Sequence, residues 1–468
     1  MADGGLGRRA FLRSTGAGAA LAAIGAAPAK SAVGLGGAAG QTRSGSAKNV
    51  ILLIGDGMGL GSVTLGDMYS RLTRDRRLHW VEMLNDPRVR SGLVDTQSAN
   101  GFVPDSASTA TAWSTGVKVN NGAICFTPEG DEPEPLIVEA IRRGKVGGIV
   151  TTSRLTDATP ACMYANVPKR EMEGEIAQML RERGLSVMLG GGAMHLDPVY
   201  AASPDPTCMI ARDLTGLRDA TSCGTIDPTS ERLLGLFGAQ EVPYILDRTP
   251  QTPSLLDMSM AALRWLGGHE AGFVLLIEAG RIDHAAHAND AASLVREMVE
   301  FDDVIRWASD WAMQRDDTLV LITTDHANAN AGLTHYAEEG DRHFARLQHA
   351  THSFEWIFDE FKTRSRDGGD RVNLFAEIVK AATGADLKRE DVAALVNGTL
   401  TDPFRTAGTR TALLGSLLAN HCGVAFVSPN HTSDFVLASA FGPGADGLRP
   451  FQHNTPLHGV LRNAMAWG

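Results

Sequence analysis

Residues 49–59 have the sequence Asn-Val-Ile-Leu-Leu-Ile-Gly-Asp-Gly-Met-Gly. This run favours a buried strand, and a glycine turn that carries the carboxylate of Asp56 follows it directly. The same arrangement, a short run rich in Val, Ile and Leu before glycine or polar turn residues, recurs at 148–152, 185–189, 273–277 and 318–323. Continuous apolar runs of this length are typical of parallel strands that are buried on both faces.

Amphipathic helical patterns lie between these runs, at 135–143, 171–182, 255–266 and 291–312. Strands that alternate with helices predict a doubly wound α/β fold, with a mainly parallel central sheet flanked by helices. From 336 to 425 the pattern changes to charged, amphipathic helical segments without a clear strand. We therefore expect one main domain over 48–468, with 336–425 as a mainly helical insertion or cap.

The composition agrees with a globular protein that has a large core. The chain has 468 residues, of which 43% are apolar and 21% charged. Its formal net charge of −11 argues against a nucleic-acid-binding surface, which would be basic. An anionic substrate would therefore need a local positive field, such as that of bound metal ions.

The first 29 residues resemble an export signal. Arg8-Arg9 precedes a weakly apolar Ala/Gly run that ends near Ala27-Pro28-Ala29, a pattern typical of twin-arginine signals. The run is too short and too poor in large aliphatic residues to favour a membrane span. We expect a signal peptide at 1–29, a flexible linker at 30–47, and a periplasmic or secreted protein without a membrane anchor.

Five cysteines, an odd number, occur without the spacing of a zinc finger. Cys208 and Cys223 lie in a loop-like stretch and could form a disulfide in an oxidising compartment. It is equally compatible with the sequence that all five cysteines are free, as small core or loop residues.

Residues 103–113 begin as a loop and become a helix of small residues near Ser106. A serine at a helix start lies beside unpaired backbone N–H groups and the positive end of the helix dipole, which favour an alkoxide and a bound phosphate. Asp105 or Ser106 could instead serve only as the N-cap of that helix. The sequence likewise leaves two roles for Asp56, that of a metal ligand and that of an ordinary turn residue.

Two carboxylate–imidazole pairs follow predicted strands. Asp283 and His287 are four residues apart, so one helical turn places both on the same face, ready to share a cation. Asp325 and His326 are adjacent and can reach one metal only if the chain bends there. Carboxylate with imidazole suits Zn²⁺ or another divalent first-row metal. His431 lies in a late loop, where a lone histidine is more often a surface residue than a ligand.

Six strings, in chain order, resemble the motifs of the alkaline phosphatase family: ILLIGDGMG, DSASTATAWSTGVK, DATPACMYANVPKR, EAGRIDHAAH, TTDHA and HTS. The resemblance extends from Asn49 to Leu461 and is least specific in the helical segment. It implies hydrolysis of phosphate monoesters through a covalent phosphoserine on Ser106. Arg170 would hold the phosphate oxygens, a role that suits the planar guanidinium group.

The resemblance also implies a three-metal site with two Zn²⁺ ions and one Mg²⁺ ion. The implied ligands are Asp283, His287 and His431 for the first Zn²⁺; Asp56, Asp325, His326 and the Ser106 oxygen for the second; and Asp56, Thr159 and Glu278 for the Mg²⁺. Asp105, Asp157 and His284 would lie beside these ligands. Asp157 resembles the bacterial form of the third site and His284 the animal form, so the identity of the third ion stays open.

Small phosphorylated metabolites are the substrates that the resemblance implies, and family members are often homodimers. A phosphodiesterase or a sulfatase on the same fold is the nearest alternative. Ser106 argues against both, because sulfatases carry a modified cysteine or serine and many diesterases a threonine at this position. A non-enzymatic protein that binds metal or phosphate is an alternative of a different class.

Overall fold

The computed structural model describes residues 46–222, 226–334, 336–400 and 409–467. The predicted signal peptide and most of the predicted linker lie outside the described residues. Cys223 also lies outside them, and so therefore does the possible Cys208–Cys223 pair. No helix within the described ranges is both long enough and apolar enough to cross a membrane.

One sheet of ten strands forms the centre of the fold. The strands are β1 (Asn49–Gly55), β2 (Arg90–Asp95), β3 (Val146–Arg154), β4 (Val187–Gly191), β5 (Cys208–Ala211), β6 (Arg232–Leu236), β7 (Phe273–Ala279), β8 (Thr318–Thr323), β13 (Val436–Phe441) and β14 (Phe451–His453). Their spatial order is β14-β2-β13-β8-β1-β7-β3-β4-β6-β5. Only β13 among these strands runs antiparallel to its neighbours. The predicted doubly wound, mainly parallel sheet is confirmed.

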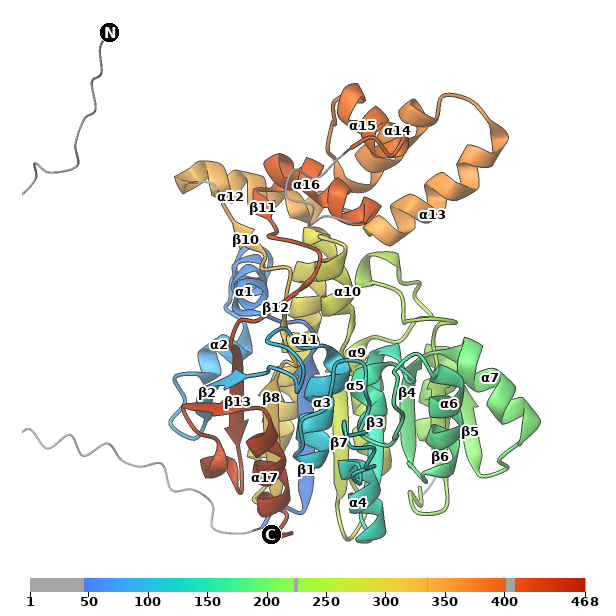
Figure 1. Ribbon diagram of the computed structural model, residues 1–468, viewed down its shortest axis with the longest axis vertical. Helices are drawn as coiled ribbons and strands as arrows, with labels where there is room; N and C mark the ends of the chain where they lie inside the picture. Colours follow the sequence, from blue (N-terminus) through green and yellow to red (C-terminus); the bar gives the residue numbers. More distant parts are fainter. Residues whose placement is uncertain (1–45, 223–225, 335, 401–408, 468) are drawn as a thin grey trace, which may run out of the picture. The chain divides into compact units, whose positions relative to one another are not determined.

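Helices cover both faces of this sheet. They are α1 (Leu60–Arg74), α2 (His79–Met83), α3 (Ser106–Thr115), α4 (Leu136–Arg142), α5 (Ala158–Ala161), α6 (Glu173–Glu182), α7 (Ala193–Ala202), α8 (Leu214–Ser222), α9 (Leu255–Leu266), α10 (Arg281–His287), α11 (Ala291–Met313) and α17 (Thr455–Ala464). Helices α3, α4 and α17 lie on the near face in Figure 1. Helices α1, α9 and α11 pack on the opposite face.

The alternation of side chains along β1 produces two separate cores. Ile51 and Leu53 belong to the apolar cluster with α1, α9 and α11, whereas Leu52 and Ile54 belong to the cluster with α3, α4 and α17. Successive side chains of a strand point to opposite faces, so a continuous apolar run serves both cores. This accounts for the composition of the 49–54 run.

The region from 337 to 422 is helical, with α12 (Ala337–Ala345), α13 (Phe354–Arg364), α14 (Arg371–Thr383), α15 (Arg389–Val396) and α16 (Arg410–Cys422). Helices α13 to α16 have an apolar cluster of their own that includes Ile357, Phe375 and Leu414. Two short antiparallel strands, β10 (Gly332–Leu333) and β11 (Val424–Ala425), join the two ends of the region. Short 3-10 helices occur at Ile245–Asp247, Arg346–His349, Ser365–Asp367 and Ala445–Gly447.

Candidate metal and phosphate site

Adjacent parallel strands carry the candidate residues to one edge of the sheet. Asp56 follows β1, Glu278 lies near the end of β7, and Asp325 follows β8. Thr159 is in α5, which follows β3, the neighbour of β7 on its other side. Parallel strands end at a common edge, where open α/β sheets bind their ligands.

Asp283, His287 and His431 form a first group. The Nε2 atom of His287 lies 3.2 Å from an oxygen of Asp283 and 3.0 Å from Nε2 of His431. The last pair is too close for two nitrogens without a shared proton or cation. Asp283 and His287 come from the same face of α10, as their spacing predicted.

Backbone carbonyl groups orient both imidazoles of this first group. The Nδ1 atom of His287 lies 2.5 Å from the carbonyl oxygen of Pro429, and Nδ1 of His431 lies 2.9 Å from that of Pro104. With a proton on each Nδ1, both Nε2 lone pairs point toward the group. Such second hydrogen bonds are a regular feature of histidines that bind metal ions.

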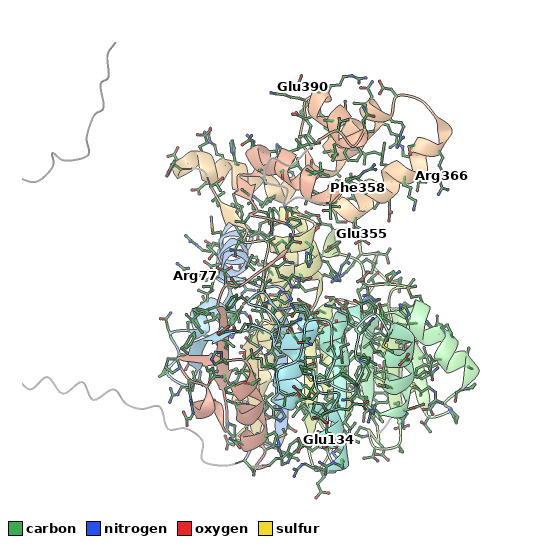
Figure 2. All side chains as sticks on the ribbon, viewed as in Figure 1. Arg77, Glu134, Glu355, Phe358, Arg366 and Glu390 are labelled. Carbon is green, nitrogen blue, oxygen red and sulfur yellow. The ribbon has the colours of Figure 1, made fainter. Side chains whose placement is uncertain are left out.

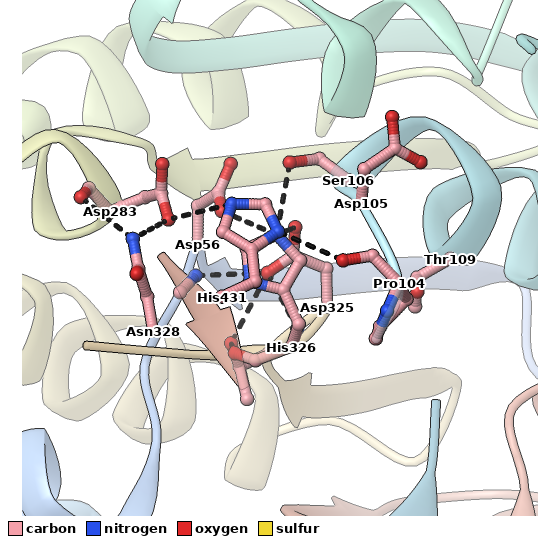
Figure 3. A network of polar contacts seen from close by, with 12 residues as sticks. Asp56, Pro104, Asp105, Ser106, Thr109, Asp283, Asp325, His326, Asn328 and His431 are labelled. Carbon is pink, nitrogen blue, oxygen red and sulfur yellow. Dashed lines mark hydrogen bonds and ion pairs between the residues drawn. The ribbon is translucent and has the colours of Figure 1, made fainter. Parts of the chain in front are cut away.

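A short strand pair brings His431 to the site across more than a hundred residues of sequence. β12 (His431–Thr432) pairs antiparallel with β9 (Ala327–Asn328), and His431 lies opposite Asn328. The ring of His431 stacks on that of His326 with centroids 3.6 Å apart (Figure 3). His431 is therefore not a stray surface residue.

Asp56, Asp325, His326 and Ser106 form a second group next to the first. The Nε2 atom of His326 lies 3.0 Å from Asp325, 3.7 Å from Asp56 and 3.2 Å from the Ser106 hydroxyl oxygen. Asp325 and His326 lie between β8 and β9, where the chain bends as required for both to face one point. Four potential ligand atoms therefore converge here (Figure 3).

Ser106 is the first residue of α3, and Asp105 is its N-cap. A carboxylate oxygen of Asp105 accepts a hydrogen bond from the Ser108 N–H at 2.9 Å, and the other oxygen accepts from the Gly122 N–H. Because Asp105 performs the capping, the Ser106 side chain is left to face His326. Asp105 is therefore the N-cap of α3, and Ser106 remains the candidate nucleophile.

Gly57 allows the two groups to lie close together. Its φ is +66°, and a Cβ built there would lie 2.4 Å from a carboxylate oxygen of Asp283. Its N–H donates to Asp325 at 2.9 Å. Any larger residue would push the Asp283 group away from the Asp325 group, which explains the glycine turn after β1.

Buried oxygens without partners indicate that these groups suit cations. Asp56 Oδ1 and Thr159 Oγ1 are buried and have no hydrogen-bond partner in the described part of the chain, and the buried Asp325 Oδ2 faces Nε2 of His326 at 3.0 Å. Burial raises the pKa of Asp56 well above its ordinary value, and the neighbouring carboxylates of Asp325 and Asp283 raise it further. Burial also raises the pKa of Glu278 to about 8. Divalent ions would relieve both the desolvation and the repulsion among these carboxylates.

Arg170 lies at the rim of the second group, between two carboxylates. Its Nη2 donates to Asp157 at 2.8 Å, and its Nη1 lies 3.4 Å from Asp105. Burial alone would lower the pKa of Arg170, but Asp157 and Asp105 raise it, so the guanidinium stays charged. The planar group is thus held in place beside the start of α3, where it can face an anion.

A third cluster, of Asp157, Glu241 and His284, has ligand atoms within 4.8 Å of one another. Arginines already neutralise it. Arg154 is paired with Glu241 and lies 3.5 Å from Asp157, while Arg281 donates to His284 at 3.2 Å. This cluster is therefore an ion-pair network beside the site, and none of its described carboxylate oxygens is left without a partner as Asp56 Oδ1 is in the second group.

Several contributors were not expected from the sequence. Asn328 donates to Asp283 at 2.6 Å, and the Thr151 hydroxyl donates to Glu278. The Thr324 hydroxyl accepts from the Met58 N–H at 2.9 Å and donates to the His326 carbonyl oxygen at 2.9 Å. Thr324 and Asn328 lie in the polar string that follows β8, so its density of Thr, Asp, His and Asn was the available signal.

The fold and these groups together define an α/β protein that carries candidate metal ligands and a helix-start serine at the carboxyl edge of its sheet. The Alkaline phosphatase family model matches residues 47–467. The chain therefore belongs to the alkaline phosphatase family.

Known relatives agree with this assignment. Tissue-nonspecific alkaline phosphatase of Gallus gallus is 33% identical over 334 residues, which cover 60% of this chain and 64% of that protein. Alkaline phosphatase 3 of Bacillus subtilis is 27% identical over 439 residues, covering 88% of this chain and 87% of that protein. The crystal structure of Thermus thermophilus alkaline phosphatase superposes with a TM-score of 0.83 at 27% identity, covering 91% of this chain and 93% of that chain. The chain thus spans less than two thirds of the length of the vertebrate relative.

Proposed function

We propose that this chain hydrolyses phosphate monoesters with Ser106 as the nucleophile. One observation carries the proposal: the Ser106 hydroxyl lies at the start of α3 and 3.2 Å from Nε2 of His326, within a group of carboxylates that suits a cation. The helix start offers unpaired N–H groups to a phosphoryl group, and the serine offers the atom that attacks it.

We infer that the ions are Zn²⁺ in the first and second groups and Mg²⁺ in a third position. The ligands would be Asp283, His287 and His431; Asp56, Asp325, His326 and Ser106; and Asp56, Thr159 and Glu278. Imidazole with carboxylate favours Zn²⁺, whereas an all-oxygen set favours Mg²⁺. When bound, such ions lower the pKa of coordinated hydroxyl groups and neutralise charge on the phosphoryl oxygens.

The chain's own residues would carry the reaction as a double displacement. Ser106 Oγ forms a bond to phosphorus while the bond from phosphorus to the alcohol oxygen breaks, and the alcohol leaves with a proton. Water then attacks the phosphorus, breaks its bond to Oγ, and releases inorganic phosphate with Ser106 restored. Arg170 and the N–H groups of α3 would hold the phosphoryl oxygens through both steps.

Replacing Arg170 with Ala is expected to lower kcat/KM for p-nitrophenyl phosphate by about 10²-fold, since a charge-assisted contact to the phosphoryl group is lost. Arg170→Lys should recover only part of this loss, because an ammonium group cannot make two parallel hydrogen bonds. Steady-state kinetics of both variants tests this role. Arg181→Ala is the matched control, because the guanidinium of Arg181 contacts Ser203 and Tyr200. Equal rates for wild type and Arg170→Ala would contradict the role of Arg170.

A comparison of three esters tests the reaction class. The proposal predicts faster turnover of p-nitrophenyl phosphate than of bis-p-nitrophenyl phosphate or p-nitrophenyl sulfate, each measured with protein loaded with Zn²⁺ and Mg²⁺. Preference for the diester would indicate a phosphodiesterase, and preference for the sulfate would indicate a sulfatase.

We also propose that residues 1–29 direct export through the twin-arginine route to the periplasm or the medium. The Arg8-Arg9 pair before the Ala/Gly run supports this proposal. Changing both arginines to lysine is expected to leave the protein inside the cell, as measured by cell fractionation and immunoblotting. Unchanged export would contradict the twin-arginine route.

A further inference from the structure

A cavity of about 440 Å³ opens beside the first group, between α10 and α13. Its lining includes His287 and Arg281 of α10 and Glu355, Phe358 and Asp359 of α13. Figure 2 shows Glu355 and Phe358 on the part of α13 that lies toward α10. Two of these lining residues form an ion pair, with Arg281 Nη2 2.6 Å from Glu355.

The cavity lies where the alcohol part of a monoester would project. In an in-line displacement the leaving oxygen lies opposite the attacking atom, which here is Ser106 Oγ. Ser106 belongs to the second group, so the leaving oxygen would face the first group, which His287 shares with His431. His287 also lines the cavity. The residues of this cavity would therefore contact the alcohol rather than the phosphate.

Arg281 does not make the cavity positive. Its guanidinium stacks on Tyr244 at 3.5 Å, and its charge is balanced by Glu355 at 2.6 Å and by Glu241 at 3.9 Å. Only 3% of the Arg281 side chain is exposed, so it offers little of its charge to a ligand. Asp359 lines the same cavity and makes no ion pair with the described residues, which leaves an unbalanced negative charge there.

Phe358 adds an aromatic surface next to these carboxylates. It lies one helical turn from Glu355 on α13, and its ring contacts Phe375 of the α13–α16 cluster at 5.3 Å. The half-buried ring also lines the cavity. An aromatic face beside carboxylates is the arrangement that binds ammonium groups, through the ring quadrupole and the opposite charge.

We propose that this cavity binds the alcohol part of the substrate and selects monoesters whose alcohol carries a quaternary or primary ammonium group. The inference rests on the proposed monoesterase activity and names the substrate class of that site. Asp359 supplies the unbalanced negative charge, and Phe358 supplies the aromatic face. The same negative charge disfavours anionic alcohol groups.

A pair of isosteric esters tests the proposal. Choline phosphate and 3,3-dimethylbutyl phosphate have the same shape but differ in one positive charge. The ratio of their kcat/KM values, choline phosphate to the neutral ester, is expected to fall about threefold to fivefold in Asp359→Asn and in Phe358→Leu. Glu360→Gln removes the same charge from the same helix at a residue paired with Arg364 and outside the cavity lining, and should leave the ratio unchanged.

Calorimetry separates this inference from the proposed activity. Both esters are titrated into Ser106→Ala protein, and into the same protein with Asp359→Asn, after loading with Zn²⁺ and Mg²⁺. If choline phosphate binds more tightly than the neutral ester, and Asp359→Asn abolishes the difference, the inference about the cavity is supported. If the wild-type protein nevertheless turns over no ester, the monoesterase proposal alone fails. The inference would be overturned if the two esters bind equally well, or if Asp359→Asn and Phe358→Leu leave the ratio of kcat/KM values unchanged. Turnover of p-nitrophenyl phosphate by the wild-type protein would still support the monoesterase proposal in that case.

Discussion

Ser106→Ala is expected to lower kcat for p-nitrophenyl phosphate by at least about 10³-fold, because the covalent route loses its nucleophile. The substitution removes one hydroxyl at the first residue of α3 and leaves the Asp105 cap in place. Ion content, measured by mass spectrometry of the metals, should stay close to that of wild type, since the other three members of the second group remain.

Ser114→Ala is the control for this result. Ser114 is buried near the other end of α3, where its hydroxyl oxygen accepts from the Leu136 N–H at 2.9 Å. Loss of that hydrogen bond should cost stability of about 1 kcal/mol and little activity. Turnover by Ser106→Ala at the wild-type rate would show that the nucleophile has been assigned wrongly.

Removal of metal ions is expected to abolish activity and to lower the Tm. Without cations, the buried carboxylates of Asp56, Asp283 and Asp325 repel one another, and Asp56 Oδ1 has no hydrogen-bond partner among the described residues. A ligand at a free concentration of 100 times its Kd stabilises the folded state by about 2.7 kcal/mol. Re-addition of the metal ions should therefore reverse much of the decrease in Tm. Chelation followed by Zn²⁺ and Mg²⁺, with rate and thermal unfolding measured at each stage, tests this.

Asp283→Asn provides a matched variant for that experiment. It keeps the size of the side chain but weakens the first group, so we expect one fewer bound ion per chain while the second group still fills. A chelated protein with full activity and an unchanged Tm would contradict the metal-dependent account.

Much of the fold followed from local patterns. The continuous apolar runs of β1, β3, β4, β7 and β8 are buried on both faces, so the pattern of each strand is unambiguous. The outer strands β2, β5 and β14 were not predicted, because they are short or half exposed and their residues lack such a run. Strand β13 runs antiparallel between β2 and β8, an arrangement that tertiary packing determines.

Site residues could be predicted where their spacing in the sequence, or a motif that contains them, indicated their role. The four-residue spacing of Asp283 and His287 fixed their common face, and the structure brings them together as predicted. The approach of His431 depends on the β9–β12 pairing over a long sequence separation, which no local pattern encodes. Asn328 was missed although it lies in the polar string after β8, and the cavity was missed because it is formed by residues of α10 and α13 that are far apart in sequence.

The most direct test of the central claim is to trap the phosphorylated enzyme. Protein loaded with Zn²⁺ and Mg²⁺ is mixed with a ³²P-labelled monoester and quenched in acid, and the labelled peptide is then identified by mass spectrometry. The account predicts label on the peptide that contains Ser106, and on its hydroxyl. Continued turnover with no labelled peptide, or with label on another residue, would contradict it.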